Sequence, residues 1–324
     1  SEDGIQRALT CLHVYKHIMT VLGIKECRAV ATAAVRNASN GEEFLKRVND
    51  ETGITMNIIT GEREAYLGYL GVINTIAMKD FLLFDLGGAS VEMTLVQDGE
   101  NIHSISLPIG AVTLTEKFNT QGNPDEEAIA ACLKYIRKKM SEVEWLPHIN
   151  LPIIGIGGTA RNIAKMDQRA TNYELSKLHN YIMPLDHFEN IFETLSTHSS
   201  ANRKKIPGLS SDRSDLIVAG AAVIKSIFDL TGSSEMVVSG CGLREGLFFE
   251  YYASYCNLPS PRFDDILDFS VKNFIGTLNG FILNKGHYEQ VTRIATQLFD
   301  ELKPLHGYGE RERLLLQTAA QLHD

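Results

Sequence analysis

Long apolar runs are missing from this 324-residue sequence, and none approaches the ~18–20 residues that a membrane-spanning helix needs. Cysteine is sparse: the five residues are scattered, and no two stand in a CxxC spacing. A dispersed, odd set argues against a disulfide framework or a zinc site and is typical of reduced thiols. The N-terminus, SEDG, shows no signal-peptide pattern. We therefore expect a cytoplasmic protein without membrane contacts.

Positive charge is also in short supply. The sequence has 31 Lys and Arg against 40 Asp and Glu, for a net charge of −9. This balance argues against broad nucleic-acid binding, so we expect no nucleic-acid partner. The sequence also lacks a GxxxxGK[ST] P-loop, a GxGxxG motif opening a βαβ unit, and a GxSxG elbow. A polyanionic substrate must then be held by a local basic patch or by a metal ion.

Short apolar runs alternate with amphipathic helical patterns as far as residue 256. The expected strands are 27–32, 55–59, a hairpin over 81–96, 103–108, 151–156 and 235–239; the expected helices are 4–22, 41–51, 61–76, 124–145, a segment after 159, 186–200, 214–230 and 243–255. This alternation predicts a layered α/β fold. The segment NLPSPRF (257–263) reads as a linker, and only helical patterns follow it.

One short internal sequence repeat indicates a duplication. TAAVRNA (32–38) and GTARNIA (158–164) each follow a short apolar strand and carry Arg-Asn before an apolar helix. With the hairpin, this layout is that of actin, Hsp70 and sugar kinases, in which two ribonuclease-H-like domains flank a phosphate cleft. We expect such a domain over residues 1–75, a second over 76–256, and an all-α C-terminal segment over 260–324.

The segment FLLFDLGGASVEMTLV (81–96) carries the strongest chemical signal. It predicts two strands joined by a glycine-rich turn, with Asp85 and Glu92 beside it. Glycine lets a phosphate approach backbone amides closely, and a carboxylate next to a phosphate makes sense when a cation lies between them. The candidate phosphate ligands are Gly87, Gly88, Ala89 and Ser90. The alternative is a plain hairpin turn, which the cost of two nearly buried carboxylates disfavours.

Glu62 and Glu64 open the predicted helix in GEREAYLGYLG. Acidic residues in a first helical turn complement the helix dipole. The spacing alone favours this interpretation. The alternative is that one of them is a general base for water attack on a terminal phosphate. Nothing in the spacing chooses between the two glutamates.

A second glycine-rich strand end is IIGIGGTARNI (153–163). Gly157, Gly158 and Thr159 at a strand-to-helix turn suit an anion. They equally suit a tight turn with Thr159 as the N-cap.

Basic residues that can reach a cleft are few. Arg36 follows an apolar strand and small residues, so it can reach a phosphate. The densest basic cluster is Arg-Lys-Lys at 203–205 with Arg213. Spaced Lys and Arg can neutralise successive charges of a polyphosphate. For 203–205 a solvated surface face is the favoured alternative.

Six separated motifs resemble, in order, those of the exopolyphosphatase/guanosine pentaphosphate phosphohydrolase (Ppx/GppA) family. They are ATAAVRNASNGEEFL (31–45), ITGEREAYLGYLG (59–71), FDLGGASVE (84–92), GIGGTARNIA (155–164), IPGLSSDRSDLIVAG (206–220) and SGCGLREGLFFE (239–250). The resemblance covers about residues 30–255. It implies a phosphohydrolase acting on inorganic polyphosphate, guanosine pentaphosphate or both, and makes a homodimer plausible.

The resemblance also implies roles for single residues. Glu64, just before Ala65, matches the family's catalytic base. Asp85 and Glu92 match its metal-associated carboxylates, which implies Mg²⁺ or another divalent cation. Arg36 matches an arginine with an implied phosphate contact, and Gly157, Gly158 and Thr159 match a cleft loop. The family's phosphate loop usually reads GGGS, and Ala89 here replaces its third glycine.

Two departures stand out. Nothing in residues 1–30 resembles the family's first phosphate loop, Asp-x-Gly-Ser-Asn. We expect that the segment carrying this loop is absent from this sequence, rather than that the protein has lost half of its phosphate-binding site, because a sheet without its central strands would leave backbone unpaired. The helical tail resembles the start of an HD-like domain and ends on His323-Asp324; the favoured alternative is an ordinary helical appendage. The absence of the first phosphate loop also supports an alternative function, that of a non-catalytic protein that binds polyphosphate or an alarmone. A kinase of the same architecture is a third alternative.

Overall fold

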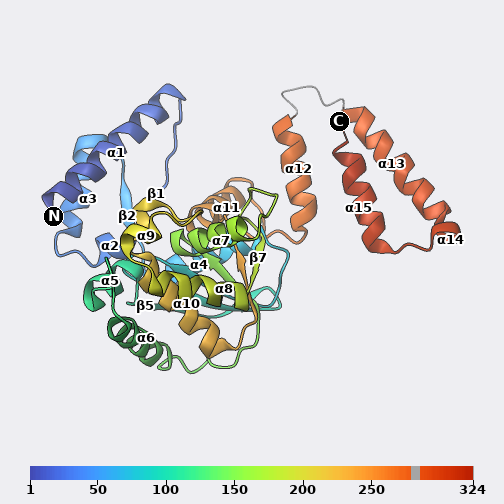
Figure 1. Ribbon diagram of the computed structural model, residues 1–324. Helices are drawn as coiled ribbons and strands as arrows, with labels where there is room; N and C mark the ends of the chain where they lie inside the picture. Colours follow the sequence, from blue (N-terminus) through green and yellow to red (C-terminus); the bar gives the residue numbers. More distant parts are fainter. Residues whose placement is uncertain (279–284, 324) are drawn as a thin grey trace. The chain divides into compact units, whose positions relative to one another are not determined.

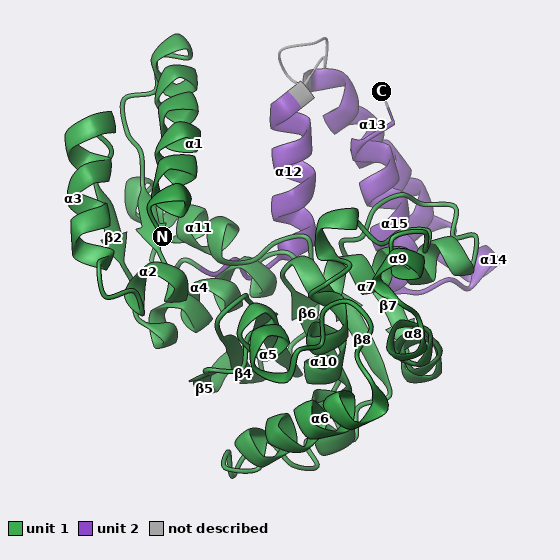
Figure 2. Ribbon diagram, turned by 60° about the vertical axis from the view of Figure 1, so that its left-hand side comes forward, with its two compact units in different colours: residues 1–261 green, residues 262–324 purple. Residues whose placement is uncertain are grey.

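A computed structural model describes residues 1–278 and 285–323. Asp324, the partner of His323 in the C-terminal motif, lies outside the described residues. The chain divides into two compact units, residues 1–261 and 262–324, which are described separately below (Figure 2). The α/β fold with a helical C-terminal segment is confirmed.

A six-stranded mixed sheet forms the centre of the first unit (Figure 1). Its strands are β3 (Phe81–Leu86), β4 (Val91–Gln97), β5 (Glu100–Leu107), β6 (Ile153–Ile156), β7 (Tyr181–Pro184) and β8 (Glu235–Val238). Their spatial order is β5-β4-β3-β6-β8-β7. The neighbours β3, β6 and β8 run parallel, whereas β4, β5 and β7 each pair antiparallel with their neighbours.

The central strand β3 is apolar on both faces because helices cover both sides of the sheet. Its alternate residues enter two different cores: Phe81 and Leu83 belong to one, Leu82 and Phe84 to the other. The first core is built largely with α4 (Gly61–Ile73), which lies against α11 (Leu243–Tyr255). The larger core includes residues of α5 (Ala111–Phe118), α6 (Glu126–Met140), α7 (Gly158–Ala170), α8 (Leu185–Thr197) and α10 (Ile217–Thr231).

The N-terminal part has a small core of its own, in which Leu9, Val48 and Ile54 are buried. Its elements are α1 (Glu2–Val21), β1 (Ala29–Ala31), α2 (Ala33–Arg36), α3 (Gly41–Thr52) and β2 (Met56–Ile58). The strands β1 and β2 pair in parallel and form a separate two-stranded sheet. The predicted boundary between residues 75 and 76 stays a prediction.

The second unit is helical throughout its described residues. It comprises α12 (Ile266–Leu278), α13 (Lys285–Glu301), α14 (Lys303–His306) and α15 (Glu310–Gln321). Helices α13 and α15 pack side by side, with the short α14 at the turn between them (Figure 1). No described helix of either unit is both long and apolar enough to cross a bilayer.

Five short elements were not predicted. They are α2, α5, the edge strand β7, the one-turn helix α9 (Ser200–Arg203) and a 3-10 turn (Ser211–Arg213). The helix expected over 124–145 is shorter than predicted, because it begins at Glu126 after the N-cap Asp125 and ends at Met140. The surface position favoured for the basic run 203–205 is wrong for Arg203. Arg203 is fully buried, and its guanidinium donates to the carbonyls of Leu195, His198 and Gly122.

Helices α4 and α11 approach closely because glycines face backbone at the crossing. A Cβ added to Gly246 would lie 1.8 Å from the carbonyl oxygen of Leu67, and one added to Gly71 would lie 2.1 Å from that of Gly242. These are backbone atoms, so a side chain at either position forces the two helices apart.

We expect Gly246→Ala to lower the free energy of unfolding by about 1–3 kcal/mol, as overpacking of a core does. Urea unfolding followed by circular dichroism measures it. Gly4→Ala is the matched control, because the nearest atom to its added Cβ is the Ser1 Oγ at 3.5 Å. Equal stability of the two variants would contradict the proposed close approach.

Candidate active site

The β3–β4 hairpin places two carboxylates opposite each other. Asp85 pairs with Glu92 in the antiparallel register, on the last residues before the turn. Glu92 is only 3% exposed. Its Oε1 accepts hydrogen bonds from the hydroxyls of Ser90, at 2.7 Å, and Ser106 on β5, at 2.6 Å. These two bonds fix the orientation of the Glu92 carboxylate.

The turn itself is held by the start of α5. The carbonyl of Gly87 accepts from the amide of Ala111, and the carbonyl of Gly88 accepts from the amides of Val112 and Thr113, at 2.9–3.1 Å. The amide of Gly87 donates within the turn, to the Ser90 carbonyl. A Cβ on Gly110 would lie 2.3 Å from the carbonyl oxygen of Gly88, so the turn can pack against the start of α5 only because residue 110 has no side chain.

The amides of Gly88, Ala89 and Ser90 make no hydrogen bond to any other described residue. Gly88 is exposed and Ala89 partly so. Three successive amides of this kind in a tight turn form a concave donor set that suits a phosphate oxygen. Ala89 has its amide in this set, so the methyl group that replaces the family's glycine does not consume a donor.

Glu64 lies in the first turn of α4 and is 9% exposed. The helix begins there because the Thr60 hydroxyl accepts from the amide of Arg63 at 3.1 Å. Gly61 allows the helix start to lie against β5, since a Cβ would come within 2.6 Å of the Ser106 Cβ. Ser106 is the residue that also bonds Glu92, so Glu64 and Glu92 share one neighbourhood.

Arg36 reaches this neighbourhood from the end of α2. Its Nη1 donates to the Ile59 carbonyl at 2.6 Å and to Glu64 Oε2 at 3.2 Å. The predicted phosphate contact of Arg36 stays a prediction. What the structure adds is an ion pair that holds the Glu64 side chain in place.

The three carboxylates repel one another. The pKa of Glu64 is raised, first by burial and then by the charge of Glu92, while Arg36 opposes the rise. Burial, followed by the charges of Glu92 and Glu64, raises the pKa of Asp85 to about 7. Arg161 opposes that rise. A cluster of this kind is typical of a functional site, because a structural role rarely needs three mutually repelling acids.

The start of α7 faces Asp85. Gly157 has φ +92°, and a Cβ there would lie 2.9 Å from Asp85 Oδ1. Gly158 lies under the guanidinium of Arg213, whose Cζ would be 2.7 Å from an added Cβ. Thr159 is 3% exposed and packs against Gly220 of α10. The N-cap of α7 is Gly157, with no side-chain cap, so the alternative of Thr159 as the N-cap is wrong. Anion binding by this terminus stays a prediction.

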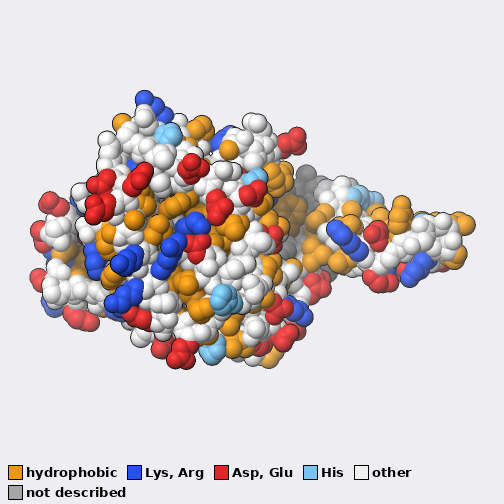
Figure 3. All heavy atoms as spheres, turned by 60° about the horizontal axis from the view of Figure 1, so that its bottom comes forward, with side chains coloured by type: hydrophobic (Ala, Val, Ile, Leu, Met, Phe, Trp, Pro, Cys, Tyr) orange, Lys and Arg blue, Asp and Glu red, His pale blue; other side chains and the backbone are white. Residues whose placement is uncertain are grey.

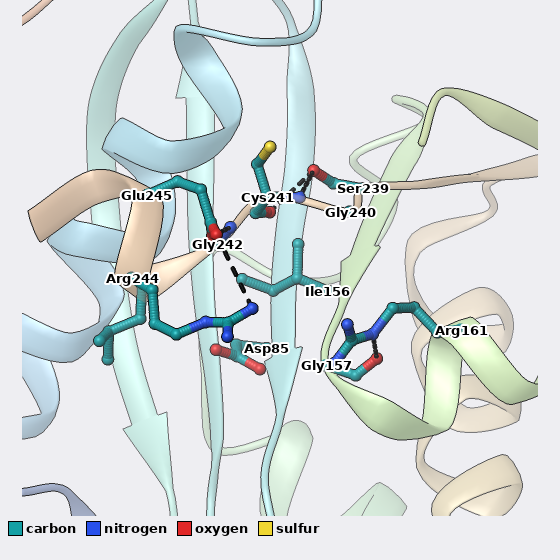
Figure 4. A pocket seen from close by; sticks show the side chains of 11 residues that line it. Asp85, Ile156, Gly157, Arg161, Ser239, Gly240, Cys241, Gly242, Arg244 and Glu245 are labelled. Atoms are coloured by element: carbon teal, nitrogen blue, oxygen red, sulfur yellow. Dashed lines mark hydrogen bonds and ion pairs between the residues drawn. The ribbon is translucent and has the colours of Figure 1, made fainter. Parts of the chain in front are cut away.

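A cavity of about 150 Å³ opens beside Asp85. It is lined by Asp85, Ile156, Gly157, Arg161 and residues 239–245. Figure 4 shows Arg161 and Arg244 extending toward Asp85 from α7 and α11. The cavity therefore carries positive charge next to a carboxylate, on the side of the sheet reached by the carboxyl ends of β3, β6 and β8.

Two site residues were missed from the sequence. Ser106 gave no signal, because its contact with Glu92 depends on the β4–β5 register. Arg161 did give one, since it occupies in the second segment of the internal repeat the place that Arg36 occupies in the first. Each arginine follows a strand and lies near a carboxylate: Arg36 pairs with Glu64, and Arg161 acts on the pKa of Asp85.

The donor set fits a hard divalent cation of the Mg²⁺ type. Among the residues that the structure describes, no three His, Cys, Asp or Glu gather in a geometry that could hold a metal ion by themselves. Mg²⁺ needs no such set, because it commonly binds through one or two carboxylates, waters and substrate phosphates. Asp85 and Glu92 supply two carboxylates that lie opposite each other in the hairpin register.

The model of the Ppx/GppA phosphatase family matches residues 1–254. The chain belongs to the Ppx/GppA phosphatase family. A solved Ppx/GppA family member from Aquifex aeolicus has a TM-score of 0.68 and 30% identity, over 79% of this chain and 83% of that one. An exopolyphosphatase structure from Cytophaga hutchinsonii has a TM-score of 0.73 and 26% identity, over 78% and 83%. The predicted family and its actin-like fold are thus confirmed.

The names of the curated relatives state different activities. A bifunctional 3-dehydroquinate synthase/phosphatase from Fusobacterium nucleatum is 34% identical over 248 residues, which are 74% of this chain and 37% of that protein. A guanosine-5'-triphosphate,3'-diphosphate pyrophosphatase from Vibrio vulnificus is 26% identical over 335 residues, covering all of this chain and 63% of that protein. The chain thus spans between about two fifths and two thirds of these relatives' length.

We expect Asp85→Asn to stabilise the first unit at pH 8 but not at pH 4. The folded-state pKa of Asp85 lies near 7 against 3.8 for the unfolded chain, so stability is lost as pH rises between these values. The full shift corresponds to at most about 4 kcal/mol, at 1.36 kcal/mol per pKa unit. Thermal unfolding in EDTA at both pH values measures the gain. Asp50→Asn, at an exposed carboxylate, serves as the control, and an equal gain for Asp85→Asn at both pH values would refute the assignment.

Proposed function

We propose that the protein is a phosphohydrolase that removes the terminal phosphate of inorganic polyphosphate, guanosine pentaphosphate or both. The observation that carries this proposal is the cluster of Glu64, Asp85 and Glu92 beside the glycine-rich turn with the amides of Gly88, Ala89 and Ser90. Family membership supports the phosphatase class, and the relatives named as exopolyphosphatase and guanosine pentaphosphate pyrophosphatase support these substrates.

Glu64 is the proposed general base. Burial and the charge of Glu92 raise its pKa toward the range in which a carboxylate accepts a proton well near neutral pH. The Arg36 ion pair orients the carboxylate and opposes the rise of its pKa. In the reaction, Glu64 takes a proton from water as the water oxygen bonds to the terminal phosphorus. The bridging P–O bond breaks, and the shortened phosphate chain leaves.

The β3–β4 turn and the start of α7 hold the substrate in this proposal. The amides of Gly88, Ala89 and Ser90 bind oxygens of the terminal phosphoryl group. Asp85 and Glu92 hold a divalent cation, which neutralises phosphate charge when bound. The start of α7 at Gly157, Gly158 and Thr159 contacts further phosphates. These assignments are predictions, as is the homodimer that the resemblance implies.

The local charge suits such a substrate despite the net charge of −9. Figure 3 shows Lys and Arg side chains gathered on one face, with acidic side chains scattered around them. Positive charge of this kind draws a polyanion to one part of a protein that repels it overall.

We expect Glu64→Gln to lower kcat by about 10²–10⁴-fold with Mg²⁺ present, since an amide accepts no proton from water. Phosphate release from polyphosphate and from guanosine pentaphosphate measures it. Glu62→Gln is the matched control, because Glu62 lies in the same helical turn but is exposed. Undiminished activity of Glu64→Gln would eliminate this mechanism.

The same assay separates the alternative functions. Turnover of either substrate without a phosphate acceptor supports hydrolysis, whereas transfer from ATP to an acceptor indicates a kinase. Tight binding of polyphosphate with no turnover, in a full-length protein, favours a non-catalytic binding role. Saturating Mg²⁺ must be present in all three measurements, because Asp85 and Glu92 alone supply too few ligands for tight metal binding.

A further inference from the structure

Both side-chain hydrogen bonds to the buried Glu92 carboxylate end on the same oxygen. The hydroxyls of Ser90 and Ser106 donate to its Oε1 at 2.7 Å and 2.6 Å. A carboxylate oxygen offers two lone-pair positions, so both positions of Oε1 are occupied. Among the residues that the structure describes, none donates to Oε2. One oxygen of Glu92 is therefore held by the protein, and the other is open to a ligand.

The Ser106 side chain has little freedom to turn away from Glu92. The two residues are cross-strand partners on β5 and β4, so their side chains stand on the same face of the sheet. The start of α4 lies directly against Ser106, because a Cβ on Gly61 would come within 2.6 Å of the Ser106 Cβ and 2.9 Å of its Oγ. Strand register and helix packing thus fix the serine hydroxyl, and the hydroxyl fixes Glu92.

The number of open oxygens on a carboxylate matters for the kind of cation that it binds. Ca²⁺ takes about 6–8 oxygen ligands in a flexible geometry and accepts both oxygens of one carboxylate. Mg²⁺ is smaller, demands a nearly ideal octahedron and keeps several waters, so it needs fewer oxygens from the protein. A Glu92 that offers only Oε2 therefore suits Mg²⁺ and denies Ca²⁺ a bidentate ligand.

We propose that Ser106 is a positioning residue that, together with Ser90, limits Glu92 to one open oxygen and so favours Mg²⁺ over Ca²⁺. This inference rests on the proposed function, in which Asp85 and Glu92 hold a divalent cation. Ser106 acts through Glu92 and contacts neither the substrate nor the cation. Loss of its hydroxyl frees one position on Oε1, so that both oxygens of Glu92 can contact one ion and the preference moves toward Ca²⁺.

The test uses the full chain, with Mg²⁺ and Ca²⁺ added separately. The rise in melting temperature above the value in EDTA, followed against the concentration of each ion, gives an apparent affinity for that ion. The quantity compared between variants is the ratio of the Ca²⁺ affinity to the Mg²⁺ affinity, so that a general loss of stability cancels. Glu92→Gln measures binding elsewhere on the protein, and its response is subtracted. Circular dichroism verifies that each variant is folded.

We expect the parent to bind Mg²⁺ more tightly than Ca²⁺, and Ser106→Ala to raise the Ca²⁺-to-Mg²⁺ ratio by about fivefold. Ser90→Ala should shift the ratio in the same direction, because it removes the other donor to Oε1. Ser104→Ala is the matched control. Ser104 lies two residues from Ser106 on the same face of β5, but its hydroxyl contacts Thr94 and Asn101, so the ratio should stay that of the parent.

Three results would overturn the role of Ser106. They are an unchanged ratio in Ser106→Ala, an equal rise in Ser104→Ala, and a parent that prefers Ca²⁺. Phosphate release at saturating Mg²⁺ is measured in parallel and keeps the two proposals apart. If the parent releases phosphate while Ser106→Ala leaves the ion ratio unchanged, only the positioning role fails. If Glu92→Gln binds both ions as well as the parent does, the metal assignment in the proposed function fails with it.

Discussion

The pairing of Asp85 with Glu92 across the β3–β4 hairpin is the constraint on which the site depends. Antiparallel register brings two acids together at the end of a strand whose other residues are apolar and buried. The fold tolerates Glu92 because two hydroxyls bond it. Asp85 has no comparable hydrogen-bond donors among the described residues, so burial and the neighbouring carboxylates raise its pKa. A positive charge beside Asp85 would lower the pKa of its carboxyl again, and in the proposed mechanism a divalent cation supplies that charge.

The hairpin and its acids were predictable from the sequence, because both flanking strands are apolar throughout and the turn holds two glycines. The helix of Glu64 was equally clear from its pattern, but the role of Glu64 came only from the family resemblance. The contact of Glu92 with Ser106 was not predictable. It depends on the β4–β5 register, which shifts at Leu95 and Val96, and pattern alone does not locate such a shift.

The missed elements are those that tertiary contacts create. Helix α5 (AVTLTEKF) is rich in β-branched residues and has low intrinsic helix propensity, yet the turn carbonyls cap its first amides. Strand β7 has four residues, ends in Pro184 and forms only because β8 offers an edge. Arg203 looked like a surface charge, but its guanidinium donates to the carbonyls of Leu195 and His198 at the end of α8 and to that of Gly122. Gly122, like the partners of α5 and β7, is distant in the sequence.

The bonds between the turn and α5 have a consequence for the thermodynamics of binding. A helix N-terminus often serves as the anion site itself. Here the first amides of α5 are occupied by the carbonyls of Gly87 and Gly88, so the helix acts as a brace. The turn is already in a fixed conformation before any ligand arrives, and little backbone entropy remains to be lost on association. Affinity for phosphate should then be limited by desolvation of the amides of Gly88, Ala89 and Ser90 rather than by ordering of the loop.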